Sequence, residues 1–233
     1  MLLSIIRWIV IVLVSIILGL IAVISSILGE NIIHSVTRMW GRWICRLTGV
    51  RVEVSGIENV LRDRAQIFIS NHQGMYDIFA MQGYLPVSFL WIAKESLFKI
   101  PIIGLAMKRA GYIGVNKASP KKFYKSLYRA IEEIKKGKSI IIFPEGTRTA
   151  DGSVGRFKRG SLFLIFRTGV PVVPVTISGS FNVMRRGKFR ISPGRIKILI
   201  DKPIEIKEIH HSQEEELMEM MRGIIVKNLQ ELS

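Results

Sequence analysis

The hydrophobic pattern divides the chain into an uncharged N-terminal stretch and a longer part in which apolar and polar residues alternate. The stretch from Trp8 to Leu28 contains no charged residue. As a helix rising about 1.5 Å per residue, it is about 30 Å long and matches the hydrocarbon core of a membrane. A cleaved signal peptide is the alternative, but the apolar run is too long for one and no clear cleavage site follows it. We predict a membrane-embedded helix, which either spans the bilayer or lies in one leaflet.

The next segment has the pattern of an amphipathic helix. Apolar residues recur at helical spacing, at Ile33, Val36, Trp40, Ile44 and Leu47. Arginines recur every four residues on another face, at Arg38, Arg42 and Arg46. Because Trp40 and Trp43 suit the lipid headgroup region, this pattern predicts a helix lying in the membrane interface. The alternative is a core helix with a solvated arginine face, and in either case Gly49 ends the helix.

Beyond residue 50, short apolar runs typical of strands alternate with helical patterns. Strands are predicted at residues 51–54, 67–70, 88–93, 112–115, 139–143, 172–178 and 195–200. Helices are predicted at residues 75–84, 102–109, 120–136, 160–167 and 213–232. Such alternation predicts an α/β fold in which helices flank a mixed β-sheet. We divide the chain into a membrane-associated part, residues 1–49, and an α/β domain, residues 50–233.

Composition narrows the classes of partner. Of 233 residues, 34 are Lys or Arg and 18 are Asp or Glu, which gives a formal net charge of +16. This charge predicts a polyanionic partner, which is an anionic bilayer, a nucleic acid or a phosphorylated substrate. The uncharged N-terminal run and a mean hydropathy of +0.31 favour the bilayer, and no aromatic-basic motif of the RNA-binding type is present. A lone Cys45 excludes an intramolecular disulfide, and without a Cys/His cluster a zinc site is not expected.

Candidate chemistry begins where the second predicted strand ends. His72 follows this strand, and Asp77 lies five positions further on. On one continuous helix the two side chains would point about 140° apart, so they meet only if His72 lies on a strand-to-helix turn and Asp77 in the helix. Gly74 would help such a turn. A carboxylate that orients an imidazole makes a general base, whereas the alternative is a turn histidine bonded to local groups. No Ser or Cys stands out as its nucleophile, so we predict that the activated hydroxyl belongs to a substrate.

A second candidate site follows the predicted strand 139–143. The turn that begins at Phe143 and Pro144 presents the Glu145 carboxylate, the backbone of Gly146 and Thr147, and the Arg148 guanidinium. The planar fork of an arginine suits a phosphate group, so this turn is a candidate anion site. A loop with a surface ion pair is the alternative.

Basic residues surround these two turns. Lys94 and Lys117 each follow an apolar run, at the edge where open α/β sheets bind ligands, and are therefore candidates for phosphate contacts. Arg156, Lys158 and Arg159 form a further basic cluster, part of which we interpret as solvated charge.

The segment 170–177 contains two prolines, Pro171 and Pro174. A strand with two prolines is not expected to be central and fully paired, because proline donates no backbone hydrogen bond. We predict a structural edge strand here rather than the wall of an acyl-chain groove.

These blocks, in this order, resemble the glycerolipid acyltransferase family, especially the 1-acyl-sn-glycerol-3-phosphate acyltransferases. Asn71, His72 and Asp77 match the family's Asn-His-x-x-x-x-Asp motif, residues 143–148 match Phe-Pro-Glu-Gly-Thr-Arg in full, and residues 170–175 match its Val-Pro-rich motif. The remaining motif departs from the family pattern, because Gly114 replaces an aromatic residue and Lys117 replaces an arginine. Lysine keeps the charge and loses the bidentate fork.

The resemblance implies transfer of a fatty acyl group to the sn-2 hydroxyl of lysophosphatidic acid, which gives phosphatidic acid. The donor would be a fatty acyl thioester of CoA or of acyl carrier protein, and no bound cofactor or metal would be needed. His72 would act as the base and Asp77 would fix its tautomer. The acceptor's phosphate and glycerol would bind to a set of residues on the sheet edge: Lys94, Lys117, Glu145, Gly146, Thr147 and Arg148. Backbone N–H groups near Gly146 would stabilise the oxyanion.

Location follows from the charges around the apolar run. Arg7 alone precedes the run, whereas many basic residues follow it, so the positive-inside rule places the domain at the cytoplasmic face of the cell membrane. Partners would then be anionic membrane lipid and the acyl donor, with no nucleic acid. The alternatives are an acyltransferase for another lysophospholipid or a lipid A precursor, and a non-enzymatic basic protein that binds membrane surfaces.

Overall fold

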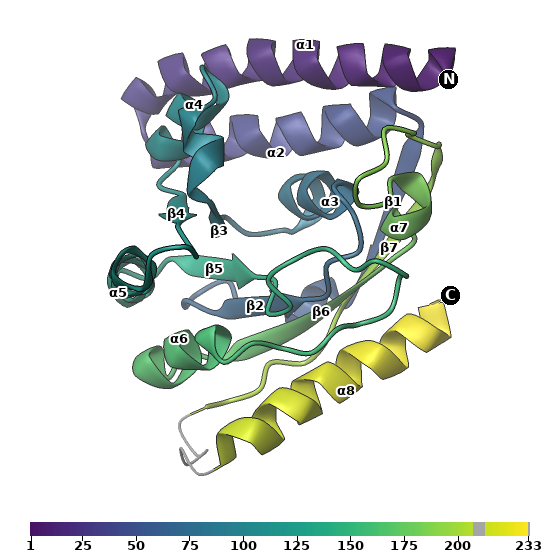
Figure 1. The fold of residues 1–233 in the computed structure, drawn as a ribbon. Coiled ribbons are helices and arrows are strands. Elements are labelled where there is room, and N and C mark those ends of the chain that lie inside the picture. The colour runs from purple at the N-terminus through teal and green to yellow at the C-terminus, as the bar shows by residue number, and fades with distance from the viewer. Residues whose placement is uncertain (207–212, 233) are drawn as a thin grey trace.

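Two antiparallel helices lie side by side over an α/β domain in the computed structural model, which describes residues 1–206 and 213–232 (Figure 1). They are α1 (Leu2–Ser25) and α2 (Glu30–Leu47). The second ends just before Gly49, as predicted, and the φ of 80° at this residue lies in the left-handed region that glycine adopts without strain.

The domain is built on a seven-stranded mixed sheet. In chain order the strands are β1 (Val50–Ser55), β2 (Ile67–Ser70), β3 (Phe89–Lys94), β4 (Ile113–Val115), β5 (Ser139–Ile142), β6 (Val172–Ser178) and β7 (Gly194–Ile200). Across the sheet the order is β1-β7-β6-β2-β5-β3-β4, and each neighbouring pair is parallel except β6 and β7. The strands β2, β5 and β6 are buried along their whole length, as expected for apolar runs covered on both faces. The predicted strands and the mixed sheet are confirmed.

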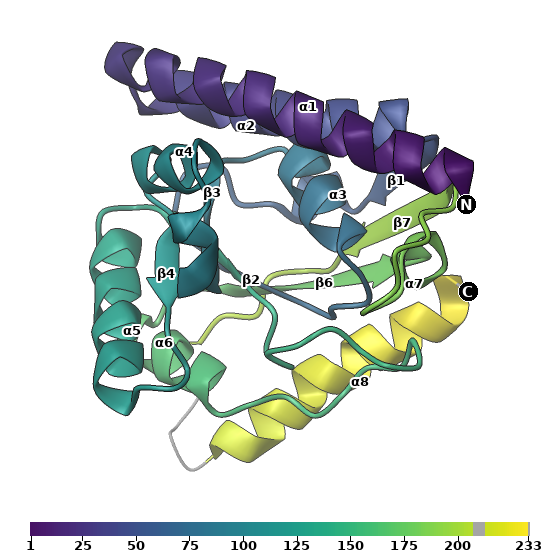
Figure 2. The ribbon, with the colours of Figure 1, turned by 45° about the horizontal axis from the view of Figure 1, so that its top comes forward.

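Helices cover the two faces of this sheet unequally. In the domain they are α3 (Tyr76–Tyr84), α4 (Ile103–Arg109), α5 (Pro120–Lys135), α6 (Gly160–Thr168), α7 (Ser180–Val183) and α8 (Glu214–Leu232). The helices α3 and α4 share a side with α1 and α2, whereas α6 and α8 lie on the opposite side and α5 flanks the β4 edge (Figures 1 and 2). The helices predicted in the domain are confirmed, each within one residue at either end. The single turn α7 was not predicted, because four residues are too few to show a helical period.

The proline-containing strand β6 is not an edge strand, and that prediction is wrong. It lies between β7 and β2, third from one side of the sheet. Pro171 precedes the strand, and its carbonyl oxygen accepts from the Ile67 N–H at 2.9 Å. Pro174 faces β7 where that strand ends: its carbonyl accepts from the Asp201 N–H at 2.9 Å, just beyond Ile200. The N–H that Pro174 lacks would therefore fall at the end of the β6–β7 hydrogen-bond ladder and not in its middle.

The apolar stripe of α2 packs inside the protein. Ile33 and Ile44 are buried, and the Trp40 ring meets Phe79 of α3 edge-on at 5.1 Å between ring centroids. Gly41 lets the two helices approach closely, since a Cβ at this position would lie 2.5 Å from the Phe79 carbonyl oxygen. These contacts correspond to the core-helix interpretation of the apolar stripe. Contact of α2 with a membrane interface stays a prediction.

The helix α1 lies along α2 and does not project away from the domain (Figure 2). Near its start, Arg7 donates to the carbonyl oxygens of Thr48 and Ile191, each at 3.0 Å. Midway along it, the Ser15 hydroxyl accepts from the Trp40 indole of α2 at 2.9 Å. The segment Leu2–Leu28 is long and apolar enough to cross a membrane by length and composition. Its outward side leaves large apolar side chains exposed, among them Ile9, Leu13, Ile17 and Ile24.

Candidate active site

The predicted meeting of His72 and Asp77 is confirmed. The strands β2, β5, β3 and β4 run parallel, so the loops that follow them gather at one edge of the sheet. His72 lies on the turn after β2, and Asp77 lies in the first turn of α3. Nδ1 of His72 is 2.7 Å from Oδ2 of Asp77.

Hydrogen bonds fix the Asp77 carboxylate, which is fully buried. Its Oδ2 also accepts from the backbone N–H groups of Gln73 at 2.7 Å and Gly74 at 2.9 Å. Its Oδ1 accepts from the Ser180 hydroxyl on α7, which is likewise buried. An ionised carboxylate only accepts, so Nδ1 of His72 carries the ring proton and Nε2 is the acceptor. In its neutral form, the imidazole can therefore take a proton at Nε2.

The His72 ring is held in place by stacking as well. It lies parallel to Phe143 at 4.0 Å between ring centroids, and Phe143 in turn stacks on Trp91 at 5.7 Å. The His72 side chain keeps 15% of its surface exposed. Nε2 makes no hydrogen bond to any of the residues that the structure describes, so it is available to a substrate.

Glu145 orders the loops around His72. Burial raises the pKa of this carboxyl group, while its two backbone hydrogen bonds act in the opposite direction. Oε1 accepts from the His72 N–H at 2.7 Å, and Oε2 accepts from the Gly155 N–H at 2.9 Å. The Arg222 side chain of α8 reaches the same loop and donates to the carbonyl oxygens of Val154 and Gly155, each at 3.2 Å. Through these two hydrogen bonds Glu145 fixes the shape of the site, and contact of Glu145 with glycerol stays a prediction.

The remaining predicted binding residues do not all converge. The Lys117 ammonium donates to the Gly146 carbonyl oxygen at 2.7 Å, across the width of β3. Thr147 is exposed, and Arg148 is half-buried with its side chain free of any ion pair within the described residues. Lys94 ends β3 at the same sheet edge, where it is exposed and makes no hydrogen bond to the others in the described part of the chain.

The N–H of Gly146 itself is already used in a backbone hydrogen bond, which bears on the predicted stabilisation of the oxyanion. Gly146 has a φ of 72°, and its N–H donates to the Phe143 carbonyl oxygen at 2.9 Å. This N–H therefore holds the turn and is not free to stabilise an oxyanion.

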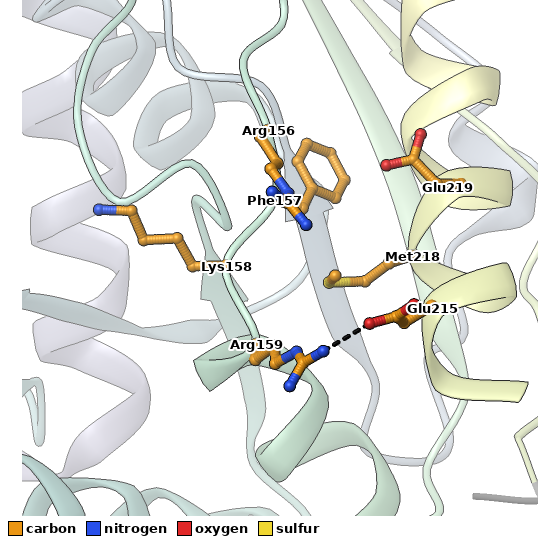
Figure 3. A pocket seen from close by; sticks show the side chains of 7 residues that line it. All are labelled: Arg156, Phe157, Lys158, Arg159, Glu215, Met218 and Glu219. Atoms are coloured by element: carbon orange, nitrogen blue, oxygen red, sulfur yellow. Dashed lines mark hydrogen bonds and ion pairs between the residues drawn. The ribbon is translucent and has the colours of Figure 1, made fainter. Parts of the chain in front are cut away.

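The basic cluster that follows the Glu145 turn separates into two groups. Arg156, Lys158 and Arg159 line one side of a pocket of about 440 Å³, with α8 on the other side (Figure 3). Arg159 forms an ion pair with Glu215 of α8 at 2.5 Å, whereas Lys158 extends away from α8. The sequence carries no signal that distinguishes Lys158 from Arg159, because both lie in one run of basic residues.

The sequence also did not reveal Ser180. Ser180 stands 103 positions after Asp77, and no local pattern links the two. By contrast, Cys45 packs in the core as expected, and burial raises the pKa of its thiol to about 12. No cluster of three His, Cys, Asp or Glu side chains that could hold a metal ion occurs among residues 1–206 and 213–232.

An imidazole oriented by a buried carboxylate, with its other nitrogen open to a substrate, defines an enzyme of the general-base class. Residues 51–178 match the model of the acyltransferase family. A chloroplastic 1-acyl-sn-glycerol-3-phosphate acyltransferase of Arabidopsis thaliana is 34% identical over 198 residues, which cover 84% of this chain and 54% of that protein. A protein of the same name from Borreliella burgdorferi is 30% identical, covering 79% of this chain and 74% of its own length. The chain belongs to the acyltransferase family.

A solved structure agrees over nearly the whole chain. The crystal structure of PlsC, a 1-acyl-sn-glycerophosphate acyltransferase from Thermotoga maritima, matches with a TM-score of 0.88 and 30% identity, over 99% of this chain and 95% of that one. The present chain spans about half the length of the plant relatives from Arabidopsis thaliana and Brassica napus.

Proposed function

We propose that this chain transfers a fatty acyl group from a thioester to the sn-2 hydroxyl of 1-acyl-sn-glycerol-3-phosphate, giving phosphatidic acid. The observation that carries the proposal is the His72 imidazole, held at 2.7 Å by Asp77 with its Nε2 open. The names of the relatives supply the substrate class. The acyl donor is acyl-CoA or an acyl thioester of acyl carrier protein, and the two substrates supply all the atoms of the reaction without a bound cofactor.

The chemistry follows from the tautomer of His72. Nε2 accepts the proton of the sn-2 hydroxyl as its oxygen forms a bond to the thioester carbonyl carbon. The tetrahedral intermediate then collapses, the carbon–sulfur bond breaks, and the thiolate takes the proton back from Nε2. Asp77 stabilises the imidazolium between these two steps. General-base catalysis of this kind typically contributes about 10²–10⁴-fold to the rate.

Basic side chains at the sheet edge would bind the acceptor phosphate. Arg148 follows the Glu145 turn and has no ion-pair partner among the described residues, while Lys117 already lies against Gly146 of the same turn. Both cations therefore lie at the turn whose Glu145 carboxylate accepts from the His72 N–H. We assign Arg148 and Lys117 to the phosphate, with Lys94 further along the edge.

We place this reaction at the cytoplasmic face of the cell membrane, with α1 embedded in one leaflet. Arg7 at one end of α1 is bonded to the domain, and Gly19 nearer the other end lies against Ile102 of the α4 region. Because both ends stay beside the domain, α1 in this arrangement would lie along a membrane and not across it. Its exposed apolar side and the net charge of +16 suit an anionic surface.

Transfer by purified protein tests the proposal. The measurement uses radiolabelled lysophosphatidic acid with a panel of acyl-CoA and acyl carrier protein donors. His72→Ala is expected to abolish transfer while its flotation with anionic vesicles stays unchanged. Near-wild-type turnover of this variant would overturn the mechanism.

The acceptor is tested separately. Arg148→Ala is expected to raise the KM for lysophosphatidic acid with little change in kcat, and an unchanged KM would remove its role. A panel of other lysophospholipids and lipid A precursors, with one donor, identifies the acceptor, and faster transfer to any of them would replace the one proposed.

A further inference from the structure

Two ammonium groups lie close to Gly146. A Cβ built on this glycine would lie 2.9 Å from Nζ of Lys117 and 3.4 Å from Nζ of Lys158. Both nitrogens therefore lie within 3.4 Å of a single point beside Gly146. The preceding residue of this turn, Glu145, accepts a hydrogen bond from the His72 N–H. The two lysines come from separate loops, one after β4 and the other before α6.

The positive charges of these two ammonium groups repel each other. Burial lowers the pKa of Lys117, and the charge of Lys158 lowers it further. Neither ammonium forms an ion pair with a carboxylate of residues 1–206 and 213–232. The oxygens of the Glu145 carboxylate accept from two backbone N–H groups instead. The pair is thus a positive site with no negative partner in the described structure.

The position of Lys158 is set by its backbone. Its N–H donates to the carbonyl oxygen of Pro144 at 2.9 Å, which ties the 156–159 loop to the Glu145 turn. The neighbouring Arg159 turns the other way, to Glu215 of α8 (Figure 3). Lys158 therefore contacts the turn beside His72, whereas Arg159 contacts α8.

We propose that Lys158 and Lys117 together bind a phosphate group of a substrate beside His72. This inference rests on the proposed function, and it adds Lys158 as a binding residue that contacts the ligand. A phosphate oxygen placed between the two ammonium groups would accept a charge-assisted hydrogen bond from each. It would also remove the repulsion between them. The absence of a side chain at Gly146 leaves room for these groups, since any Cβ there would contact both.

The bound phosphate can come from either substrate, because both carry a phosphate group. One is the phosphate monoester of the lysophosphatidic acid acceptor, and the other is a phosphate of the CoA or phosphopantetheine donor. Kinetics with one substrate saturating at a time separates them. Lys158→Gln removes the charge with little change in length, Lys158→Arg keeps it, and Arg159→Gln is the matched control in the same loop.

For Lys158→Gln we expect the KM of one substrate to rise about 10–100-fold, the range of a lost hydrogen bond to a charged group, with kcat within a few fold of wild type. A rise for lysophosphatidic acid assigns the acceptor phosphate. A rise for the donor assigns the donor phosphate and removes Lys117 from the acceptor site. Lys158→Arg should recover most of the loss, and Arg159→Gln should leave both KM values unchanged. Equal KM values in Lys158→Gln and Arg159→Gln would overturn the proposal.

Direct binding measurements test the phosphate site independently of acyl transfer. Calorimetric titration of wild type and Lys158→Gln with glycerol 3-phosphate and with CoA measures the site without turnover. If wild type transfers no acyl group yet binds either probe more tightly than Lys158→Gln, the proposed function fails and the phosphate site stands. If transfer occurs and the variant binds both probes as wild type does, the function stands and the site is overturned.

Discussion

Replacing Asp77 by asparagine would remove the negative charge behind His72 while keeping the shape of the site. Oδ2 accepts three N–H groups, from His72, Gln73 and Gly74, whereas Oδ1 accepts a hydroxyl from Ser180. A hydroxyl can turn and accept instead of donate, but a backbone N–H cannot. The amide oxygen of an asparagine is therefore expected at the Oδ2 position, with its NH₂ group facing Ser180. The imidazole then keeps its proton on Nδ1.

The size of the effect follows from this orientation. A hydrogen bond to a charged group contributes about 1.5–3 kcal/mol, and the asparagine loses most of that stabilisation of the imidazolium. The expected fall in kcat is about 10–150-fold. Had the NH₂ group faced His72, the wrong tautomer would form, which costs about 10⁴-fold in a Ser-His-Asp triad. The two backbone donors at Oδ2 exclude that orientation.

Asp77→Ala provides the contrast, because it leaves the buried N–H groups of Gln73 and Gly74 without an acceptor. Each unsatisfied donor costs about 1–3 kcal/mol, so this variant should be less stable as well as inactive. The assay is transfer to radiolabelled lysophosphatidic acid, with urea unfolding of each protein. If Asp77→Asn is stable and retains kcat within twofold of wild type, the charge of Asp77 has no role. If it is stable and loses about 10⁴-fold, the predicted tautomer is wrong.

Three further predictions concern stability. Ser180→Ala should lower the free energy of unfolding by about 1.5–3 kcal/mol, since it removes a hydroxyl donor to the buried Asp77 carboxylate; an unchanged urea midpoint would contradict the contact. Glu145→Gln should weaken a pH dependence. Burial raises the pKa of Glu145 in the folded protein, so its contribution to stability falls as the pH rises from the usual glutamate pKa to the raised one. Urea titrations across that range should show a smaller fall in the variant, in which Asp201, whose pKa burial also raises, still contributes. Gly41→Ala should cost about 1–3 kcal/mol, because its Cβ would lie 2.5 Å from the Phe79 carbonyl oxygen and force α2 away from α3; a melting temperature equal to wild type would show that the helices are not in close contact.

The contrast between β6 and the His72–Asp77 pair shows where sequence reasoning holds. The pair was predictable because its members are five positions apart, and a turn followed by a helix brings such residues together. The β6 prediction failed because the cost of Pro174 depends on which neighbour its missing N–H faces. That neighbour, β7, begins 20 positions later and ends beside Pro174. Only the order of strands in the sheet settles such a question.

The sequence by itself determined the strands and the longer helices, the meeting of His72 with Asp77, and the position of the candidate anion-binding turn after β5. Each of these depends on residues within one element or one turn, where the periodicity and conformational preferences of the residues are sufficient. The tertiary structure alone decided that Ser180 fixes Asp77, that α1 lies along α2, and that Lys158 and not Arg159 lies with Lys117 close to Gly146. These contacts join segments far apart in the chain. Which of them form depends on how the whole sheet and its helices pack, and no local pattern records that packing.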